Sequence, residues 1–150
     1  MTSWICVDSG ILIKVVVPEA DSHLASQLWA SWLQQAVKPV APPLFSYEVT
    51  AVIRKAVYQN RVNTEMARIA LKSALAVKVT LLTFPHIHEE AWELATALNR
   101  PTAYDTHYLA LAKHLNCPFW TADRPLYHAA QTHFSWVHWL GELESASPLD

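Results

Sequence analysis

Two kinds of apolar pattern alternate along the chain. Short continuous apolar runs occur at residues 4–7, around Val40, and at residues 79–82, 117–121 and 136–139. Such runs are typical of strands that are buried on both faces. Between them, apolar residues recur every three or four positions, which is typical of amphipathic helices. The pattern predicts helices over residues 11–17, 22–37, 43–59, 63–77, 86–99 and 103–115, and a short helix from Arg124.

This alternation of strands and helices predicts the fold class. We expect an α/β protein, a three-layer sandwich in which a central, mostly parallel sheet of about four or five strands is flanked by helices. Within the helices, the periodic apolar positions are predicted to face the core. Those positions include Leu33, Val52, Met66, Ile69, Ala70 and Ala74, and Trp92 is expected to be a core residue for the same reason.

Two acidic residues directly follow predicted strands. Asp8 comes after the first strand, and Asp123 comes after the run at residues 117–121. In open parallel sheets, ligands bind beyond the carboxyl ends of the strands, where the helices begin. Both carboxylates are therefore candidates for one crevice. Each also has a purely structural explanation, because an Asp between a strand and a helix often caps that helix.

Two further acidic residues lie on predicted helices. Glu48 stands three residues after Phe45 and four before Val52, so it should lie on or beside the buried side of its helix. A glutamate is rare there unless it binds a ligand or pairs with a group such as an arginine. Asp105 follows Thr102 by three residues, which also fits a capping box at a helix start. The pattern alone leaves these alternatives open.

The overall composition limits the classes of function. The chain has 150 residues, of which 52% are hydrophobic and 16% charged, and this predicts one globular domain over residues 1–150. The formal net charge of −2 provides no basic surface for tight nonspecific binding of nucleic acid, so any such contact must be local or depend on bound cations. No apolar run reaches the roughly 20 residues of a membrane span. The first residues lack the features of a secretory signal, so we expect a cytoplasmic protein.

Glycine and cysteine usage narrows the choice further. The only glycines are Gly10 and Gly141. This excludes the P-loop and the G-x-G-x-x-G dinucleotide motif, because each needs several glycines in one turn. The only cysteines, Cys6 and Cys117, lie in apolar runs and are expected to be reduced thiols in the core.

Converging carboxylates favour one kind of chemistry. Four acids on separate elements would repel one another unless cations bound between them. Mg²⁺ and Mn²⁺ prefer oxygen ligands, and clustered carboxylates are a common way to hold these ions. Such a metal lowers the pKa of an attacking water and shields charge during phosphodiester hydrolysis. The pattern therefore favours a metal-dependent hydrolase of phosphodiesters.

The segments around the four acids resemble those of the PIN domain family, and especially its bacterial VapC-type toxins. The matching segments are residues 7–9, 46–49, 104–112 and 121–126. Their order and separations match over nearly the whole chain, between Trp4 and Trp139. Two features depart from the family pattern. Gly10 stands where many members have a hydroxyl or another small polar residue, and no acid follows Asp123 until Glu142.

The resemblance implies an endoribonuclease that depends on Mg²⁺ or Mn²⁺ and cuts RNA. Proteins of this family are often homodimers, and in the toxin branch a cognate antitoxin inhibits the enzyme. By the same resemblance, the metal ligands that together activate the attacking water are Asp8, Glu48, Asp105 and Asp123. Ser9 and Thr121 match polar positions beside the first and last acids, where they can form hydrogen bonds to the ligands. The alternative for both is ordinary turn and cap chemistry. The candidate contacts for RNA phosphates are Arg54, Arg100 and Arg124, and the alternative for each is a solvated surface position.

Other classes of protein fit the sequence less well. A zinc site at His86 and His88 lacks a nearby cysteine and the H-E-x-x-H motif. A phosphoacceptor receiver domain would have an adjacent acidic pair near its first strand. A haloacid-dehalogenase-like phosphatase would have a second Asp at position 10. A PIN-like module that has lost catalysis and only binds RNA or a protein is the remaining alternative, although all four acids are present.

Overall fold

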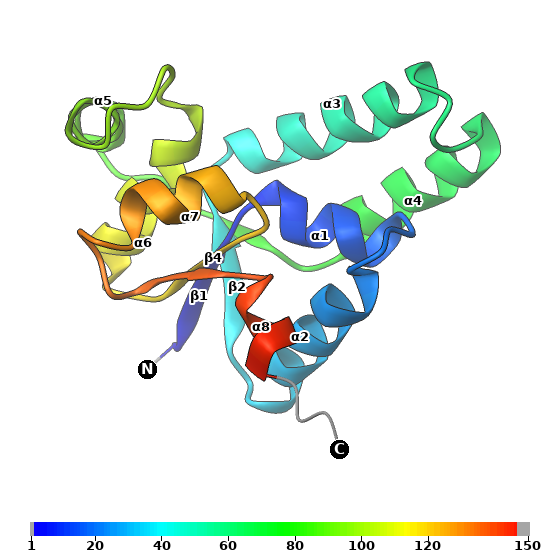
Figure 1. Ribbon diagram of the computed structural model, residues 1–150, viewed down its shortest axis with the longest axis horizontal. Coiled ribbons are helices and arrows are strands. Elements are labelled where there is room, and N and C mark those ends of the chain that lie inside the picture. The colour runs from blue at the N-terminus through cyan, green and yellow to red at the C-terminus, as the bar shows by residue number, and fades with distance from the viewer. Residues whose placement is uncertain (1, 147–150) are drawn as a thin grey trace.

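The computed structural model describes residues 2–146, within which the chain forms five strands and eight helices (Figure 1). The strands are β1 (Trp4–Val7), β2 (Lys38–Ala41), β3 (Thr80–Leu81), β4 (Phe119–Thr121) and β5 (Val137–Trp139). The helices are α1 (Ser9–Val16), α2 (Ser22–Gln34), α3 (Leu44–Tyr58), α4 (Thr64–Ala76), α5 (Ile87–Ala97), α6 (Tyr104–Leu115), α7 (Arg124–Ala130) and α8 (Glu142–Ala146).

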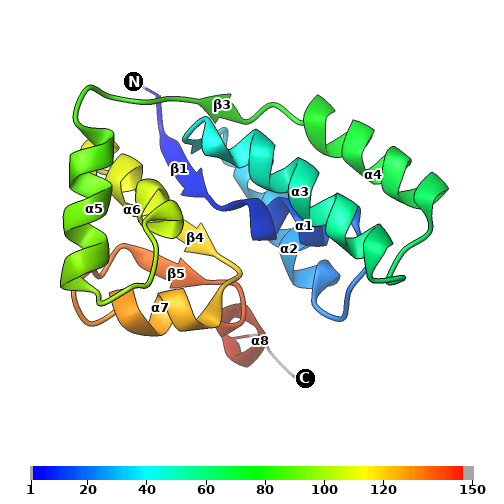
Figure 2. The same cartoon turned by 90° about the horizontal axis from the view of Figure 1, so that it is seen from above.

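The five strands form one parallel sheet in the order β3-β2-β1-β4-β5. Helix α1 contacts β4 and helix α2 contacts β2, whereas α6 contacts β1 and β4. Figure 2 shows α5 and α6 on one side of β1 and α1 and α2 on the other. A parallel sheet covered on both faces explains the continuous apolar runs of the sequence. The predicted three-layer α/β class is confirmed.

The central strand leads directly into the first helix, and this junction is tightly packed. Cys6 and Val7 are fully buried at the end of β1. The Asp8 side chain then caps α1, because its Oδ1 accepts a hydrogen bond from the backbone N–H of Ile11 at 3.1 Å. A Cβ atom on Gly10 would lie 3.1 Å from the Cβ of Ala122, the residue after β4. The close approach of α1 to this loop explains why glycine stands at position 10.

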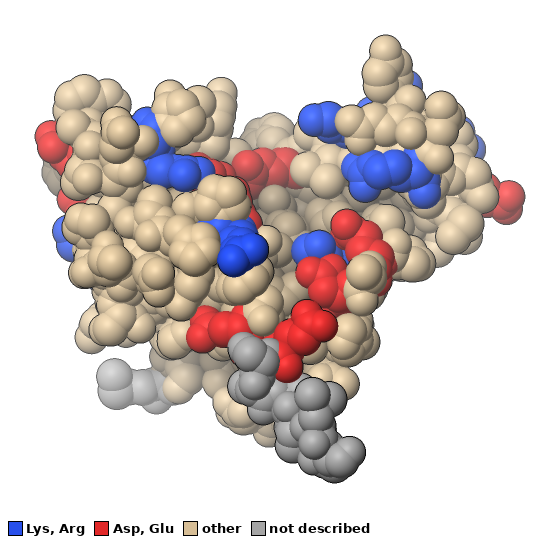
Figure 3. Space-filling model, in the orientation of Figure 1, with Lys and Arg blue, Asp and Glu red and all other residues tan. Residues whose placement is uncertain are grey.

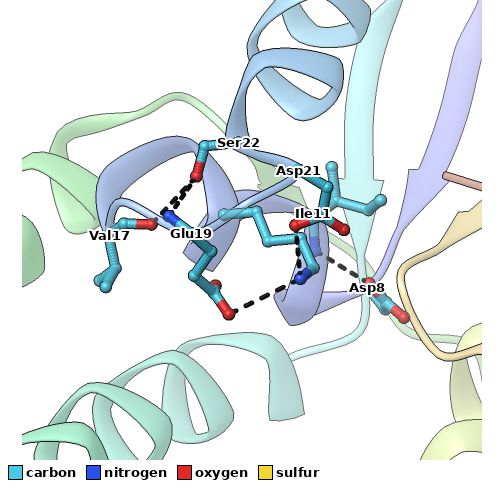
Figure 4. A network of polar contacts seen from close by, with 7 residues as sticks. Asp8, Ile11, Val17, Glu19, Asp21 and Ser22 are labelled. Atoms are coloured by element: carbon cyan, nitrogen blue, oxygen red, sulfur yellow. Dashed lines mark hydrogen bonds and ion pairs between the residues drawn. The ribbon is translucent and has the colours of Figure 1, made fainter. Parts of the chain in front are cut away.

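A polar network holds the turn between α1 and α2 (Figure 4). The Nζ of Lys14 lies 2.9 Å from Asp21 Oδ1 and 3.6 Å from Glu19 Oε1. The Ser22 hydroxyl accepts a hydrogen bond from the backbone N–H of Glu19 at 2.8 Å. The network lies at the carboxyl end of α1, whereas Asp8 lies at its amino end.

Several residues predicted to face the core are exposed instead. The exposed fractions are 69% for Leu33, 37% for Val52, 48% for Met66, 62% for Ile69 and 62% for Trp92. On α4, the positions that face the core are Ala67, Ala70 and Ala74. Because these alanines are small, the helix packs closely with that side inward, and Met66 and Ile69 turn outward.

Two other predictions can be compared with the structure. Cys6 and Cys117 are free and buried, as the sequence indicated. Among the described residues, no helix combines the length and apolar character that crossing a membrane requires.

Candidate active site

The structure brings the four predicted acids to the carboxyl edge of the sheet. Asp8 and Asp123 follow β1 and β4, which are neighbours in the sheet. Asp105 lies in the first turn of α6, and Glu48 lies on α3 one turn after its start. Figure 3 shows acidic side chains in the hollow between the α3–α4 arm and the helices α5–α7, with Lys and Arg on its flanks.

Asp8 is the most deeply buried of these acids. Its exposed fraction is 9%. The Thr121 hydroxyl donates a hydrogen bond to Oδ2, while Oδ1 serves as the helix cap. Burial raises the pKa of Asp8 to about 7, although the hydrogen bonds from Thr121 and the backbone oppose that rise. The negative charge of Asp105 raises the pKa further.

Glu48 is half-buried, as its position beside the apolar stripe predicted. The Tyr108 hydroxyl donates to Glu48 Oε1 at 2.5 Å, and the Ser9 hydroxyl donates to the same oxygen at 3.4 Å. Burial raises the pKa of Glu48, the Tyr108 hydrogen bond lowers it, and the charge of Asp105 raises it. The partners of Glu48 are hydroxyl groups, so an arginine partner does not explain its burial.

Asp105 lies among the other three acids. Burial and the charge of Asp123 raise its pKa, whereas the nearby Arg100 guanidinium lowers it. The Arg100 Nη2 lies 3.5 Å from Asp105 Oδ2. The Asp105 charge also acts on Asp8 and Glu48. One carboxylate is therefore coupled to all three of its counterparts.

The capping explanations have different outcomes at the three Asp positions. Asp8 and Asp123 both cap helices, and Asp123 Oδ1 accepts from the backbone N–H of Leu126 at 3.1 Å. Asp8 and Asp123 thus cap helices and also belong to the acidic group. Asp105 has no capping role, because α6 begins after Ala103 without a side-chain hydrogen bond at its cap.

Thr121 connects the first and last acids. It is fully buried, its hydroxyl donates to Asp8, and its Oγ1 accepts from the backbone N–H of Asp123 at 2.9 Å. Ser9 likewise contacts Glu48. Both residues therefore have the kind of contact that was predicted for them beside the acids.

The donor chemistry of this site fits a hard divalent cation. All four side chains offer oxygen atoms, which Mg²⁺ and Mn²⁺ prefer, and neither His nor Cys belongs to the group. Arg100 is the single cationic side chain of residues 2–146 that forms an ion pair with any of them. Three of the four acids have raised pKa values, so the negative charge of the site is incompletely balanced. Among residues 2–146, no group of three or more His, Cys, Asp or Glu side chains is arranged closely enough to hold a metal ion as it stands.

The three predicted RNA-binding arginines lie in different places. Arg100 reaches the acidic site, and its buried Nε has no hydrogen-bond partner among the described residues. Arg124 directly follows Asp123, and its guanidinium lies 5.3 Å from the centre of the Trp139 ring. Arg54 lies on α3, where it lines a groove beside α4.

Two polar residues of this region were not predicted to act there. Tyr108 binds Glu48, and the buried Thr106 donates from its hydroxyl to the Ala91 carbonyl at 2.7 Å, which ties α6 to α5. A signal for Tyr108 was present, because it stands three residues after Asp105 and so lies on the same side of the helix. No comparable signal identifies the partner of Thr106, which is contributed by another helix.

Comparison with known proteins gives consistent results. The sequence model of the family described as PIN domain matches residues 5–131. VapC ribonuclease Mb0985 of Mycobacterium bovis is 31% identical over 120 residues, which cover 78% of this chain and 92% of that protein. Ribonuclease VapC9 of Mycobacterium tuberculosis has the same identity and coverage.

Two solved structures share the fold. PAE2754 from Pyrobaculum aerophilum superposes with a TM-score of 0.66 at 21% identity, covering 97% of each chain. Mycobacterium tuberculosis VapC20, described as a sarcin-ricin loop cleaving toxin, superposes with a TM-score of 0.61 at 17% identity. That match covers 87% of this chain and 95% of VapC20.

Proposed function

The chain belongs to the PIN domain family, in its VapC branch, and on that basis we propose that it is an endoribonuclease that depends on Mg²⁺ or Mn²⁺. Residues 1–150 act as one nuclease domain, and the substrate is single-stranded or looped RNA. The observation that carries the proposal is the convergence of four carboxylates from four separate elements. Asp105 interacts electrostatically with each of the others.

The metal ligands in this proposal are Asp8, Glu48, Asp105 and Asp123. When bound, the cation lowers the pKa of a water molecule and shields negative charge on the reacting phosphate. The surrounding hydroxyl groups keep the ligands in place and favour their charged form. Tyr108 and Ser9 hold Glu48 through its Oε1, and Thr121 holds Asp8 through its Oδ2.

Arg100 is the best placed arginine to bind the substrate phosphate. Its side chain is 19% exposed and lies against Asp105, and its Nε has no hydrogen-bond partner within residues 2–146. Arginine side chains bind phosphate oxygens through several N–H groups at once. Arg124 and Arg54 are proposed to contact RNA farther from the acids.

Cleavage of labelled single-stranded RNA tests the proposal. We expect cutting with Mg²⁺ or Mn²⁺ and none in excess chelator. Asp8→Asn and Asp105→Asn are expected to lower the rate at least about 100-fold, because each removes charge that stabilises the reacting centre. Glu93→Gln is the matched control, since Glu93 is an exposed acid on α5. Activity that survives both chelation and the two Asp substitutions would refute the mechanism. Metal binding and RNA binding without any cleavage would instead favour a module that only binds.

We also propose the partners that the VapC resemblance implies, namely a cognate antitoxin and a second copy of the chain, in a cytoplasmic setting. Exposed apolar side chains on α4, such as Met66 and Ile69, support a protein partner. Co-expression with a short neighbouring reading frame, followed by size measurement of the purified complex, tests both partners. Recovery of a lone monomer under these conditions would contradict them.

A further inference from the structure

A second concave site lies beside the acids. It is a cavity of about 400 Å³, and its walls include Pro43, Leu44, Thr83, His88, Tyr104 and His107. Within residues 2–146, no Asp, Glu, Lys or Arg lines it. A cavity without acidic or strongly basic side chains suits a flat, neutral group better than a phosphate group.

The topology places this cavity next to the proposed cleavage site. The acids Asp8 and Asp123 follow β1 and β4, whereas Leu44 and Thr83 come shortly after β2 and β3. All four strands are parallel neighbours, so their carboxyl ends form one edge. The helices give the same result, because Leu44 lies one turn before Glu48 on α3 and Tyr104 immediately precedes Asp105 on α6. One helical turn is about 5.4 Å.

Two histidines give the cavity defined hydrogen-bonding groups. His107 Nδ1 lies 2.5 Å from the Ala103 carbonyl oxygen, and a carbonyl oxygen can only accept. His107 Nδ1 therefore carries the hydrogen, and when both rings are neutral His107 Nε2 accepts from His88 Nδ1 at 2.9 Å. In this tautomer, His88 Nε2 is left as an acceptor for an N–H group of a ligand.

Tyr104 adds a flat aromatic surface. Its side chain is 63% exposed at the start of α6, although it lines the cavity. Aromatic side chains that stack on bases, together with a few acceptors for the base edge, are the usual means of holding single-stranded RNA.

We propose that this cavity is a base-binding subsite, which holds the base of a nucleotide next to the phosphodiester that is cut. Tyr104 stacks on the base, and His88 accepts a hydrogen bond from its edge. The inference rests on the proposed function for the identity of the ligand, since RNA is the substrate there. It adds a source of sequence preference that the acids cannot provide.

A fluorescent base analogue tests the subsite. Short RNAs with 2-aminopurine at successive positions are bound to the Asp8→Asn protein, in which the RNA stays intact. Stacking on Tyr104 is expected to quench the fluorescence at one position. Tyr104→Ala should remove this quenching and weaken binding about 10-fold, and Tyr104→Phe should keep the quenching, because the stacking surface is retained.

The matched control is Tyr58→Ala. Tyr58 is 77% exposed and is the last residue of α3, whereas the cavity is lined by Leu44, the first residue of that helix. We expect this variant to bind and quench like its parent. The subsite is overturned if no position is quenched, or if Tyr104→Ala quenches and binds like Tyr58→Ala. Quenching that depends on Tyr104, together with a native protein that cuts no RNA in Mg²⁺ or Mn²⁺, would keep the subsite and reject the nuclease.

Discussion

The Asp8 carboxyl group is buried at the end of β1 with one hydroxyl and backbone N–H groups as its hydrogen-bond partners. These partners do not fully replace water, so burial raises its pKa to about 7. A cation that binds there would restore the favourable environment of the charged form. The protein without metal should therefore be sensitive to pH at this residue.

We predict that the metal-free protein loses stability as the pH rises. The folded state keeps the Asp8 proton up to a pKa of about 7, whereas the unfolded chain releases it near the ordinary value of 3.8. The favourable contribution is complete below pH 4 and is lost as the pH rises through about 7, which amounts to about 2–4 kcal/mol in the free energy of unfolding. Urea unfolding in chelator from pH 5 to 8.5 should show this decline. It should be smaller in Asp8→Asn, in which Glu48 and Asp105 still contribute to the decline, and unchanged in Glu93→Gln. An equal decline in all three proteins would contradict the assignment to Asp8.

Tyr108 is expected to act through Glu48. Its hydroxyl lowers the pKa of Glu48, so Tyr108→Phe should raise that pKa and move the acid side of the pH–activity profile to higher pH. Affinity for Mn²⁺ should also fall about 10-fold, because groups that orient metal ligands have effects of that size. Tyr47→Phe is the control, since Tyr47 is 75% exposed and adjoins Glu48 in sequence. A profile that keeps its position in Tyr108→Phe would show that the hydroxyl has only a packing role.

Among the helices and strands, the period of the apolar residues was sufficient to predict which kind of element forms. Nearly every predicted element is present, and the observed bounds differ by a few residues. The side of α4 that faces the core could be predicted only in part. The apolar period correctly includes Ala70 and Ala74, but it also includes Met66 and Ile69, which are exposed because close packing selects the small residues. Helix α8 was not predicted, because its sequence has no apolar periodicity.

Caps at the helix starts join the fold to the site, and Asp123 allows the two roles to be separated. Asp123→Asn keeps an oxygen that can accept from the backbone N–H of Leu126, so stability should change by less than about 0.5 kcal/mol. Asp123→Ala removes the cap and should lower the free energy of unfolding by about 1 kcal/mol. Both substitutions remove the charge and should lower RNA cleavage at least about 100-fold. Thermal unfolding and cleavage rates measured on the same preparations provide the comparison, and a fully active Asp123→Asn would leave Asp123 as a cap only.

At the scale of the whole molecule, strand order decides which residues meet. The sequence places Asp8 and Asp123 after strands, but the apolar pattern does not show that β1 and β4 are neighbours. The convergence of Glu48 and Asp105 could be expected only from the family resemblance. Contacts such as the one between Glu48 and Tyr108 join residues 60 positions apart, and no local pattern of the sequence indicates them. The cavity at Tyr104 could not be predicted either, since it depends on how α3, α5 and α6 meet.

Metal binding should stabilise the whole fold, and Asp105 should determine how much. Its pKa is raised despite Arg100, so loss of hydration and repulsion from Asp123 together outweigh the ion pair. Asp105→Asn should therefore raise the melting temperature of the metal-free protein. Saturating Mn²⁺, at about 100 times its dissociation constant, should add about 2.7 kcal/mol to the native protein, or about 5–10 °C in melting temperature. The same Mn²⁺ should have little effect on Asp105→Asn, and Glu93→Gln should respond like the native protein. A metal-free Asp105→Asn that melts earlier than the native chain, or that gains as much from Mn²⁺, would show that Asp105 is held by Arg100 for structural reasons rather than kept for a cation.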